Sequence, residues 1–122
     1  FVFGAVLKNN VHYRDAKTVV GYLEYERARV RWFLSIDAGH LPENAVKGEK
    51  MTYRSITIAG TELEFSDGFT DLHTKSYECI FSGDGCGVDE NRVSIETVET
   101  IRNAKILPPT STPHHLLSKV RT

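Results

Sequence analysis

Apolar and polar residues alternate from Val19 to Asp37, and this period of two predicts a pair of β-strands joined by a tight turn. With Arg27-Ala28 as the turn, Leu23 faces Trp32 across the hairpin. Side chains on a strand point alternately to its two faces. One face is then largely apolar and consists of Val19, Leu23, Tyr25, Val30, Trp32, Leu34 and Ile36. A shift of one residue would turn this apolar face to solvent, so a single register satisfies both faces.

The opposite face of this hairpin mixes aromatic residues with charges. Glu24 faces Arg31 in the predicted register, and we interpret this pair as structural. Tyr22 and Phe33 share the face, and Tyr53 is expected beside them on a later strand. Aromatic residues among charges suit a subunit interface better than bare solvent. We therefore expect a homo-oligomer that forms through this free sheet face.

A second hairpin is predicted from Met51 to Phe65, where the alternation resumes. Ala59-Gly60 suits a two-residue turn, although Asn-Gly or Asp-Gly would be a stronger signal. The resulting register pairs Ile56 with Leu63 and Arg54 with Phe65. The two hairpins together give four strands in a largely antiparallel sheet. Residues 5–12 can form a further short strand, and the Gly- and Pro-containing stretch 38–50 is predicted to be a loop.

The period changes to a helical one after Gly68. Residues then recur at helical spacing, at Phe69, Leu72, Ser76 or Tyr77, and Ile80. Asp67 or Thr70 can cap this helix, and Gly83 ends it. A second helix is predicted over residues 90–103. Strands followed by helices indicate an α+β domain, with an open, mostly antiparallel sheet that carries helices on one face.

This domain is expected to occupy residues 1–106. Residues 107–122 contain Pro108-Pro109 and a Ser/Thr-rich stretch, so they are predicted to be a flexible tail. The start Phe1-Val2-Phe3-Gly4 is typical of the last turn of a helix followed by its glycine. We therefore expect the domain to be truncated at its N-terminus.

Composition narrows the classes of function. The chain has 122 residues, of which 40% are hydrophobic and 25% charged, which is ordinary for one globular domain. Its net charge of −1 and its interspersed basic residues argue against a nucleic-acid partner. No apolar run is long enough for a membrane partner, and no signal peptide stands at the start. Cys79 and Cys86 are interpreted as reduced cysteines of a cytoplasmic protein, with a local disulfide as the alternative.

Candidate chemistry is sparse. The sequence contains no G-x-G-x-x-G, G-x-x-x-x-G-K-[ST], G-x-S-x-G or H-E-x-x-H motif. Two cysteines with His73 nearby make a poor zinc site, so no metal is expected. His73, early in the first helix, is either a substrate-facing donor or a capping or packing residue. Arg54 is either a ligand for a carboxylate or phosphate, or the ion-pair partner of Asp37 or Glu64.

Two long blocks of sequence carry a resemblance to a known enzyme family. They are GYLEYERARVRWFLSIDAGHLP, residues 21–42, and TYRSITIAGTELEFSDGFTDLHTKSYECIFSGDGCGVDENRVSIETVETIRNA, residues 52–104. Residues 1 to about 106 resemble the C-terminal domain of the glucose–fructose oxidoreductase/inositol dehydrogenase/MocA (Gfo/Idh/MocA) family. Within that family they are similar to enzymes that oxidise position 3 of UDP-N-acetyl-glucosaminuronate in bacterial surface-polysaccharide synthesis.

The resemblance implies a two-domain dehydrogenase with a UDP-sugar substrate. NAD would be bound by a Rossmann domain that precedes this stretch. The family's catalytic lysine and its G-x-H-x-x-D type segment would also precede it. No catalytic or cofactor-binding residue is therefore expected within residues 1–122, and this stretch alone is expected to be inactive. The block Phe69–Thr74 would contribute Thr70 and His73 to the sugar-side wall, with Arg54 as a further candidate contact.

Two other interpretations remain open. The chain can instead be a free-standing module that forms dimers or binds a sugar nucleotide without chemistry. It can also be a small structural domain unrelated to sugars, which requires the similarity of both blocks to be chance.

Overall fold

The computed structural model describes residues 2–67, 70–85 and 87–121. These residues form two compact units. The first unit combines residues 1–36 with residues 89–122, and the second consists of residues 37–88. The two units are described separately below.

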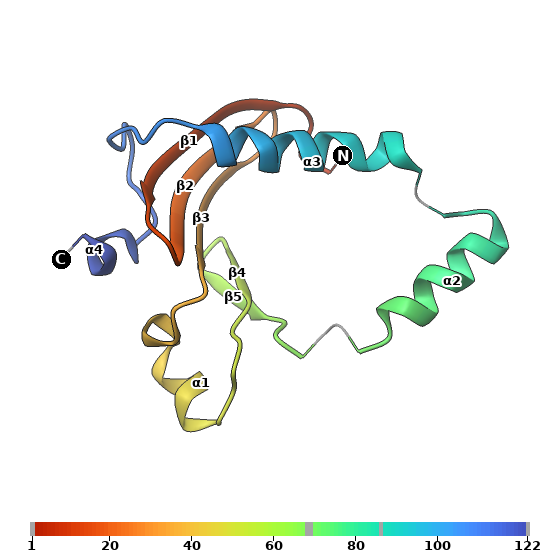
Figure 1. Ribbon diagram of the computed structural model, residues 1–122, viewed down its shortest axis with the longest axis horizontal. Helices are drawn as coiled ribbons and strands as arrows, with labels where there is room; N and C mark the ends of the chain where they lie inside the picture. Colours follow the sequence, from red (N-terminus) through yellow and green to blue (C-terminus); the bar gives the residue numbers. More distant parts are fainter. Residues whose placement is uncertain (1, 68–69, 86, 122) are drawn as a thin grey trace. The chain divides into compact units, whose positions relative to one another are not determined.

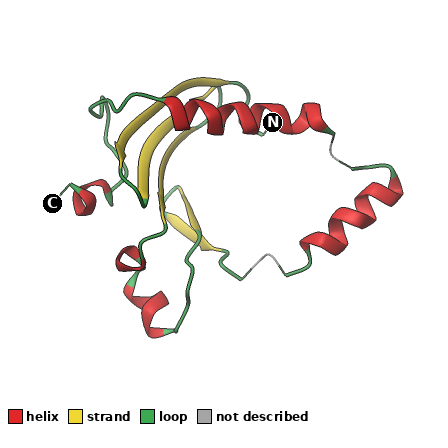
Figure 2. Ribbon diagram, in the orientation of Figure 1, coloured by secondary structure: helices red, strands yellow, loops and turns green. Residues whose placement is uncertain are grey.

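The first unit contains a three-stranded antiparallel sheet. Its strands β1 (Val6–Arg14), β2 (Thr18–Tyr25) and β3 (Arg29–Ser35) follow one another in the sheet in chain order. Figures 1 and 2 show the three strands side by side. The buried apolar residues of this unit are Val11, Val20, Tyr22, Leu23 and Leu117. The predicted hairpin is thus confirmed, and the strand predicted for residues 5–12 is present as β1.

The register of the β2–β3 hairpin differs from the predicted one by two residues. Leu23 lies opposite Val30, and Gly21 lies opposite Trp32. The turn lies one residue earlier than predicted, at Glu26-Arg27, because the Tyr25 backbone N–H donates to the carbonyl of Ala28 at 2.8 Å. A shift of two residues keeps every side chain on its predicted face, because the strand period is also two.

Gly21 explains why this register is preferred. A Cβ built on Gly21 would overlap the Trp32 indole, with Cε2 at 2.7 Å, and also the backbone carbonyl of Asn10. The indole therefore lies across β2 at the one position of that strand that has no side chain. Alternation alone cannot distinguish registers two residues apart, whereas this fit of a large ring over a glycine can.

The second unit contains a separate two-stranded sheet. Strands β4 (Ser55–Ile58) and β5 (Thr61–Glu64) pair in the predicted register, with Ile56 opposite Leu63. Ala59 and Gly60 form the turn, with φ angles of 49° and 83°. The prediction of one four-stranded sheet is therefore wrong. Alternation and turn residues predict hairpins from neighbouring residues, but they do not show which hairpins share a sheet, because any strand edge offers the same backbone groups to a neighbour.

Short helices occupy the stretch that was predicted to be a loop. They are the 3-10 helix η1 (Ala38–His40) and the α-helix α1 (Glu43–Lys47). The Asp37 carboxylate accepts a hydrogen bond from the Gly39 backbone N–H at 2.9 Å, which starts η1. Pro42 precedes the first residue of α1. Turn-forming residues thus begin two helical turns here instead of a structureless loop.

Both predicted long helices are present as α2 (Leu72–Ser82) and α3 (Val88–Asn103). Gly83 ends α2 with a φ of 82°, as predicted. The predicted helix residue Phe69 lies outside the described residues. Arg14 of β1 joins the sheet to the end of α3, because its guanidinium donates to the carbonyls of Ile101 and, at 3.3 Å, Ala104. A cation suits the negative end of a helix dipole.

The C-terminal segment packs onto the first sheet. Ile106 forms a parallel bridge to Val11, and the Leu107 backbone N–H donates to the Val11 carbonyl at 2.8 Å. A short helix, α4 (Leu117–Val120), follows, and the Leu117 side chain is only 3% exposed. The flexible tail predicted for residues 107–122 is therefore wrong for the part described. The polar composition of this segment does not show that its backbone bonds to a strand far away in the sequence.

The same segment covers part of the sheet face that was predicted to be free. The Arg31 Nε donates to the Thr112 carbonyl at 2.6 Å, and the rings of Phe33 and His114 stack with centroids 5.6 Å apart. Tyr22 is buried, at 8% exposed. Tyr53 belongs to the other unit. Tyr22 and Phe33 are thus not on a bare sheet face, and Glu24 pairs with Arg29 instead of Arg31.

Packing of His114 makes the docking of this segment dependent on pH. Burial, and then the charge of His115, lower the pKa of His114 below its usual value. A histidine with a lowered pKa stabilises the folded state above its unfolded pKa of about 6.5, and this contribution is lost as the pH falls through the folded value. We expect urea unfolding to show a larger loss of stability between about pH 7.5 and pH 5 for the native chain than for His114→Gln. A nuclear magnetic resonance titration that gives His114 a pKa at or above about 6.5 would contradict this.

Candidate functional site

The three candidate site residues lie in the second unit, on two different elements. Arg54 immediately precedes β4, whereas Thr70 lies two residues before α2 and His73 is the second residue of α2. The side chains of Thr70 and His73 are exposed, so both can meet a ligand from solvent.

Arg54 is held at the open end of the β4–β5 hairpin. Its backbone N–H donates to the Ser66 Oγ at 2.8 Å, and its Nη1 donates to the Ser66 carbonyl at 3.4 Å. The Phe65 backbone N–H donates in turn to the Arg54 carbonyl at 2.9 Å, which extends the predicted register beyond the strand ends. Glu64, one of the two ion-pair partners considered for Arg54, pairs with Lys50.

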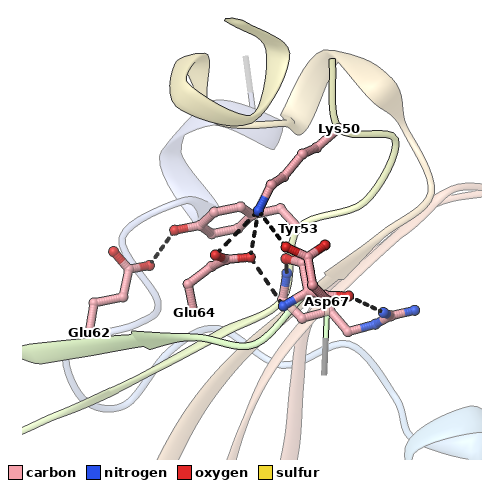
Figure 3. Close-up of polar contacts among 7 residues, drawn as sticks. Lys50, Tyr53, Glu62, Glu64 and Asp67 are labelled. Carbon is pink, nitrogen blue, oxygen red and sulfur yellow. Dashed lines mark hydrogen bonds and ion pairs between the residues drawn. The ribbon is translucent and has the colours of Figure 1, made fainter. Parts of the chain in front are cut away.

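A group of polar residues, here named the Lys50 cluster, surrounds this open end and consists of Lys50, Tyr53, Glu62, Glu64 and Asp67. Figure 3 shows the Lys50 ammonium between the carboxylates of Glu64 and Asp67. Its Nζ lies 3.4 Å from both carboxylate oxygens of Glu64 and 3.1 Å from Oδ2 of Asp67. The Tyr53 hydroxyl donates to Glu62 Oε1 at 2.8 Å. Lys50 thus links the segment before β4 to the segment after β5.

The charges of the cluster are stable at neutral pH. Hydrogen bonding to Asp67 is the main cause that raises the pKa of Lys50, and the nearby Glu64 adds to it. Hydrogen bonds from Ser66, and then the charge of Lys50, lower the pKa of Glu64. The bond to Glu62 raises the pKa of Tyr53. Because Lys50 stays protonated and Glu64 ionised, neither suits the role of a general acid–base group that exchanges protons near pH 7.

The Lys50 cluster was missed by the sequence analysis, although part of its pattern is visible. Glu62 and Glu64 are two residues apart and therefore share a strand face. Lys50, the cation that contacts Glu64 and Asp67, lies 14 residues before the former and 17 residues before the latter. Nothing local shows that Lys50 reaches them, since this depends on the fold of the stretch between Lys50 and β4.

A groove of about 490 Å³ lies in the first unit, beside the start of α3. Its lining consists of Gly4, Tyr25, Asp89, Glu90, Val93, Ser94 and Thr97. Two adjacent carboxylates on its wall would repel a diphosphate or a sugar carboxylate. The groove is therefore a poor match for a sugar nucleotide, and the candidate site remains in the second unit.

Other chemistry receives no support from the described residues. Among them, no three His, Cys, Asp or Glu side chains gather in a way that could hold a metal ion. Cys79 is exposed and free, and Cys86 lies outside the described residues. Within the same residues, none of the helices has the length and apolar character needed to cross a membrane.

Comparison with known proteins identifies solved structures that match nearly the whole chain. No family model matches the sequence. The WlbA (WbpB) dehydrogenase from Thermus thermophilus, solved in complex with NAD and α-ketoglutarate, is 44% identical over 94% of this chain, with a TM-score of 0.86. The same dehydrogenase in complex with NAD and UDP-GlcNAcA matches 95% of this chain at 42% identity, with a TM-score of 0.86.

The match covers only part of those enzymes. This chain spans 37% of the length of each solved dehydrogenase. An identity of 42–44% that extends across both units of the chain is far more than fold similarity alone requires. The chain is thus a homologue, over nearly its whole length, of one part of the WlbA (WbpB) dehydrogenase, which confirms the resemblance to dehydrogenases of nucleotide-sugar acids that its two sequence blocks indicated.

Proposed function

We propose that this chain is the C-terminal, substrate-side domain of an NAD-dependent dehydrogenase of the Gfo/Idh/MocA type. Its reaction would be the oxidation of C3 of a UDP-N-acetylated sugar acid in bacterial polysaccharide biosynthesis. The observation that carries this proposal is the 42% identity, over 95% of the chain, to a dehydrogenase that was solved with NAD and UDP-GlcNAcA.

The proposal assigns binding, not proton transfer, to the described residues. NAD, when bound, supplies the acceptor for the hydride that leaves C3. The proton of the C3 hydroxyl needs a base, and Lys50 is unsuitable because Asp67 and Glu64 keep it protonated. We therefore place the base and the NAD site in the part of the enzyme that this chain does not span.

Three side chains are proposed for the sugar-side wall. Thr70 and His73 offer a hydroxyl group and an imidazole at the exposed start of α2. Such groups can bond the hydroxyl and acetamido groups of a sugar. Arg54 has the planar donor group that binds carboxylates and phosphates in two-point contacts. A UDP-sugar acid carries both kinds of anion.

Two further properties belong to the same proposal. A free, exposed Cys79 is typical of a reducing compartment, which supports a cytoplasmic enzyme. We also retain the homo-oligomer, although the sheet face expected to form it is partly occupied by the segment that contains Thr112 and His114. The mass of the complete enzyme in solution tests this part.

The activity is tested by comparing the complete polypeptide that contains this chain with residues 1–122 alone. Both are incubated with UDP-GlcNAcA, NAD and α-ketoglutarate. Oxidation of the sugar transfers a hydride from C3 to NAD and releases the proton of the C3 hydroxyl, and reduction of α-ketoglutarate to 2-hydroxyglutarate takes up that hydride and one proton. We expect a 3-keto sugar nucleotide and 2-hydroxyglutarate from the complete polypeptide, and neither product from residues 1–122.

Two results would contradict the proposal. One is the absence of both products from the complete polypeptide when it is folded and carries NAD. The other is turnover by residues 1–122 alone, because the NAD site and the base would then have to lie within this chain.

A further inference from the structure

Helix α2 has two sides of different character, although every one of its residues is exposed. Its apolar side carries Leu72, His73, Tyr77, Ile80 and Phe81. The opposite side carries Lys75 and Glu78, which form an ion pair at 3.9 Å. An apolar helix side of this breadth is typical of burial against another part of a protein. This chain spans 37% of the length of the related dehydrogenases, so a part that it does not contain can cover this side.

His73 indicates what the apolar side of α2 meets in the complete enzyme. The proposed function places His73 in the sugar-side wall and NAD in the part of the enzyme that this chain does not span. Hydride transfer requires C3 of the sugar and the nicotinamide to come within about 3–3.5 Å of each other, in a site that excludes water. The side of α2 that carries His73 would therefore face the bound sugar, and the ion-paired side would face away from it.

Tyr77 and Ile80 are the neighbours of His73 on this side of the helix. With 3.6 residues per turn, Ile80 lies about 20° and Tyr77 about 40° from His73 around the helix axis. Residues four positions apart have Cβ atoms about 5–6 Å from each other, and aromatic side chains on a helix lean toward its N-terminus, which for Tyr77 is the direction of His73. Tyr77 and Ile80 are 62% and 60% exposed, so both have apolar surface available for a ligand.

We propose that Tyr77 and Ile80 form an apolar seat for the methyl group of the sugar's C2 acetamido substituent, and thereby select N-acetylated sugars. This inference deepens the proposed function and rests on it. C2 is bonded to C3, so a group on C2 lies within about one helical turn of a side chain that contacts the sugar beside C3. The acetamido methyl is apolar, whereas the hydroxyl, carboxylate and diphosphate groups of the nucleotide are polar. A phenol ring and a branched aliphatic side chain suit the former, and the His73 imidazole suits the latter.

Phe81 offers a matched control on the same helix. It is also aromatic and is 87% exposed. It follows His73 by eight residues, which is about 12 Å along the helix axis and too far for a substituent on C2. Tyr77→Ala and Phe81→Ala each replace an exposed ring with the residue that favours a helix most, so neither change disfavours α2 itself. Tyr77→Phe keeps the ring and removes only the hydroxyl group.

The experiment measures equilibrium binding to the complete dehydrogenase loaded with NADH, which cannot accept a hydride, so the sugar binds without reacting. Isothermal titration calorimetry compares UDP-GlcNAcA with UDP-glucuronate, which carries a hydroxyl group in place of the acetamido group. The native enzyme should bind UDP-GlcNAcA about tenfold more tightly or better. Tyr77→Ala should weaken the binding of UDP-GlcNAcA about tenfold and that of UDP-glucuronate less than about twofold. Ile80→Ala should act in the same direction with a smaller loss, whereas Tyr77→Phe and Phe81→Ala should bind both ligands as the native enzyme does.

The outcomes separate this inference from the proposed function. If the native enzyme oxidises UDP-GlcNAcA but Tyr77→Ala keeps its affinity for both ligands, or weakens both equally, the inference is wrong and the proposed function stands. Equal affinity of the native enzyme for the two ligands, or an equal effect of Phe81→Ala, also overturns the inference. Ile80→Ala provides the same test if Tyr77→Ala does not fold. If the native enzyme oxidises no UDP-sugar acid, both the proposed function and the inference fail.

Discussion

Gly21→Ala is expected to lower the free energy of unfolding of this chain by about 2–3 kcal/mol, as measured by urea denaturation. The added methyl group would overlap the Trp32 indole and the Asn10 carbonyl on opposite sides of β2. A side chain could move aside, but the carbonyl belongs to the paired strand β1 and cannot move without loss of hydrogen bonds. The indole must then tilt away from β2, so the fluorescence of this single tryptophan should shift as well.

Gly87→Ala is the matched control for this substitution. Apart from Gly87 itself and its chain neighbours, no heavy atom of the described residues lies within 4 Å of a Cβ built on Gly87. Gly87→Ala should lower the free energy of unfolding by less than about 1 kcal/mol, because only a modest preference for glycine before a helix is lost. Native stability of Gly21→Ala would mean that the indole does not lie over Gly21. The originally predicted register, with Leu34 opposite Gly21, would then be favoured.

Leu117→Ala is expected to cost about 2–3 kcal/mol, even though it changes a residue close to the C-terminus. The Leu117 side chain is 3% exposed, so its truncation removes apolar surface and leaves a cavity. The bridge between Ile106 and Val11 and the stacking of His114 on Phe33 hold the segment against the same sheet. Undocking of the segment should hence be coupled to loss of the core.

Leu107→Ala provides the comparison, since Leu107 lies in the same segment with 47% of its surface exposed. Its backbone bonds to Val11 and His12 do not depend on the side chain, so we expect a loss below about 1 kcal/mol. Equal, small effects of both substitutions would show that the segment is mobile, as its composition had indicated.

Local patterns were sufficient to predict the elements that depend on local physics. The β4–β5 register followed from alternation together with the Ala59-Gly60 turn, and Gly83 was correctly predicted to end α2. In each case the residues that decide the outcome are neighbours in sequence. The same holds for the two faces of the β2–β3 hairpin, which survive the shift in register.

Features that depend on distant residues could not be predicted in this way. The β2–β3 register depends on an indole that lies over Gly21. The packing of the tail depends on the Leu107 N–H, which donates to β1, and on the Thr112 carbonyl, which accepts from Arg31. The division into two sheets depends on which strand edges meet. A single sequence does not show which distant segments meet, because strand edges and backbone carbonyls are chemically the same at every position of the chain.

In the candidate site, too, features set by neighbouring residues were predictable and features that depend on distant residues were not. Thr70 and His73 were indicated by a resemblance, because their residue types alone do not distinguish a ligand contact from a surface position. Arg54 was placed correctly beside Phe65, although its bonds to Ser66 could not be foreseen. The Lys50 cluster was missed altogether, since its cation and its carboxylates come from separate segments.

The alanine in the β4–β5 turn has a consequence for variation among homologues. Ala59 adopts a left-handed conformation, with a φ of 49°, that asparagine or glycine tolerates with less strain. A replacement there would tighten the hairpin without touching the charged residues at its opposite end. Homologues with identical substrate contacts can therefore differ in the rigidity of this hairpin. A comparison of their binding residues alone would not reveal the difference.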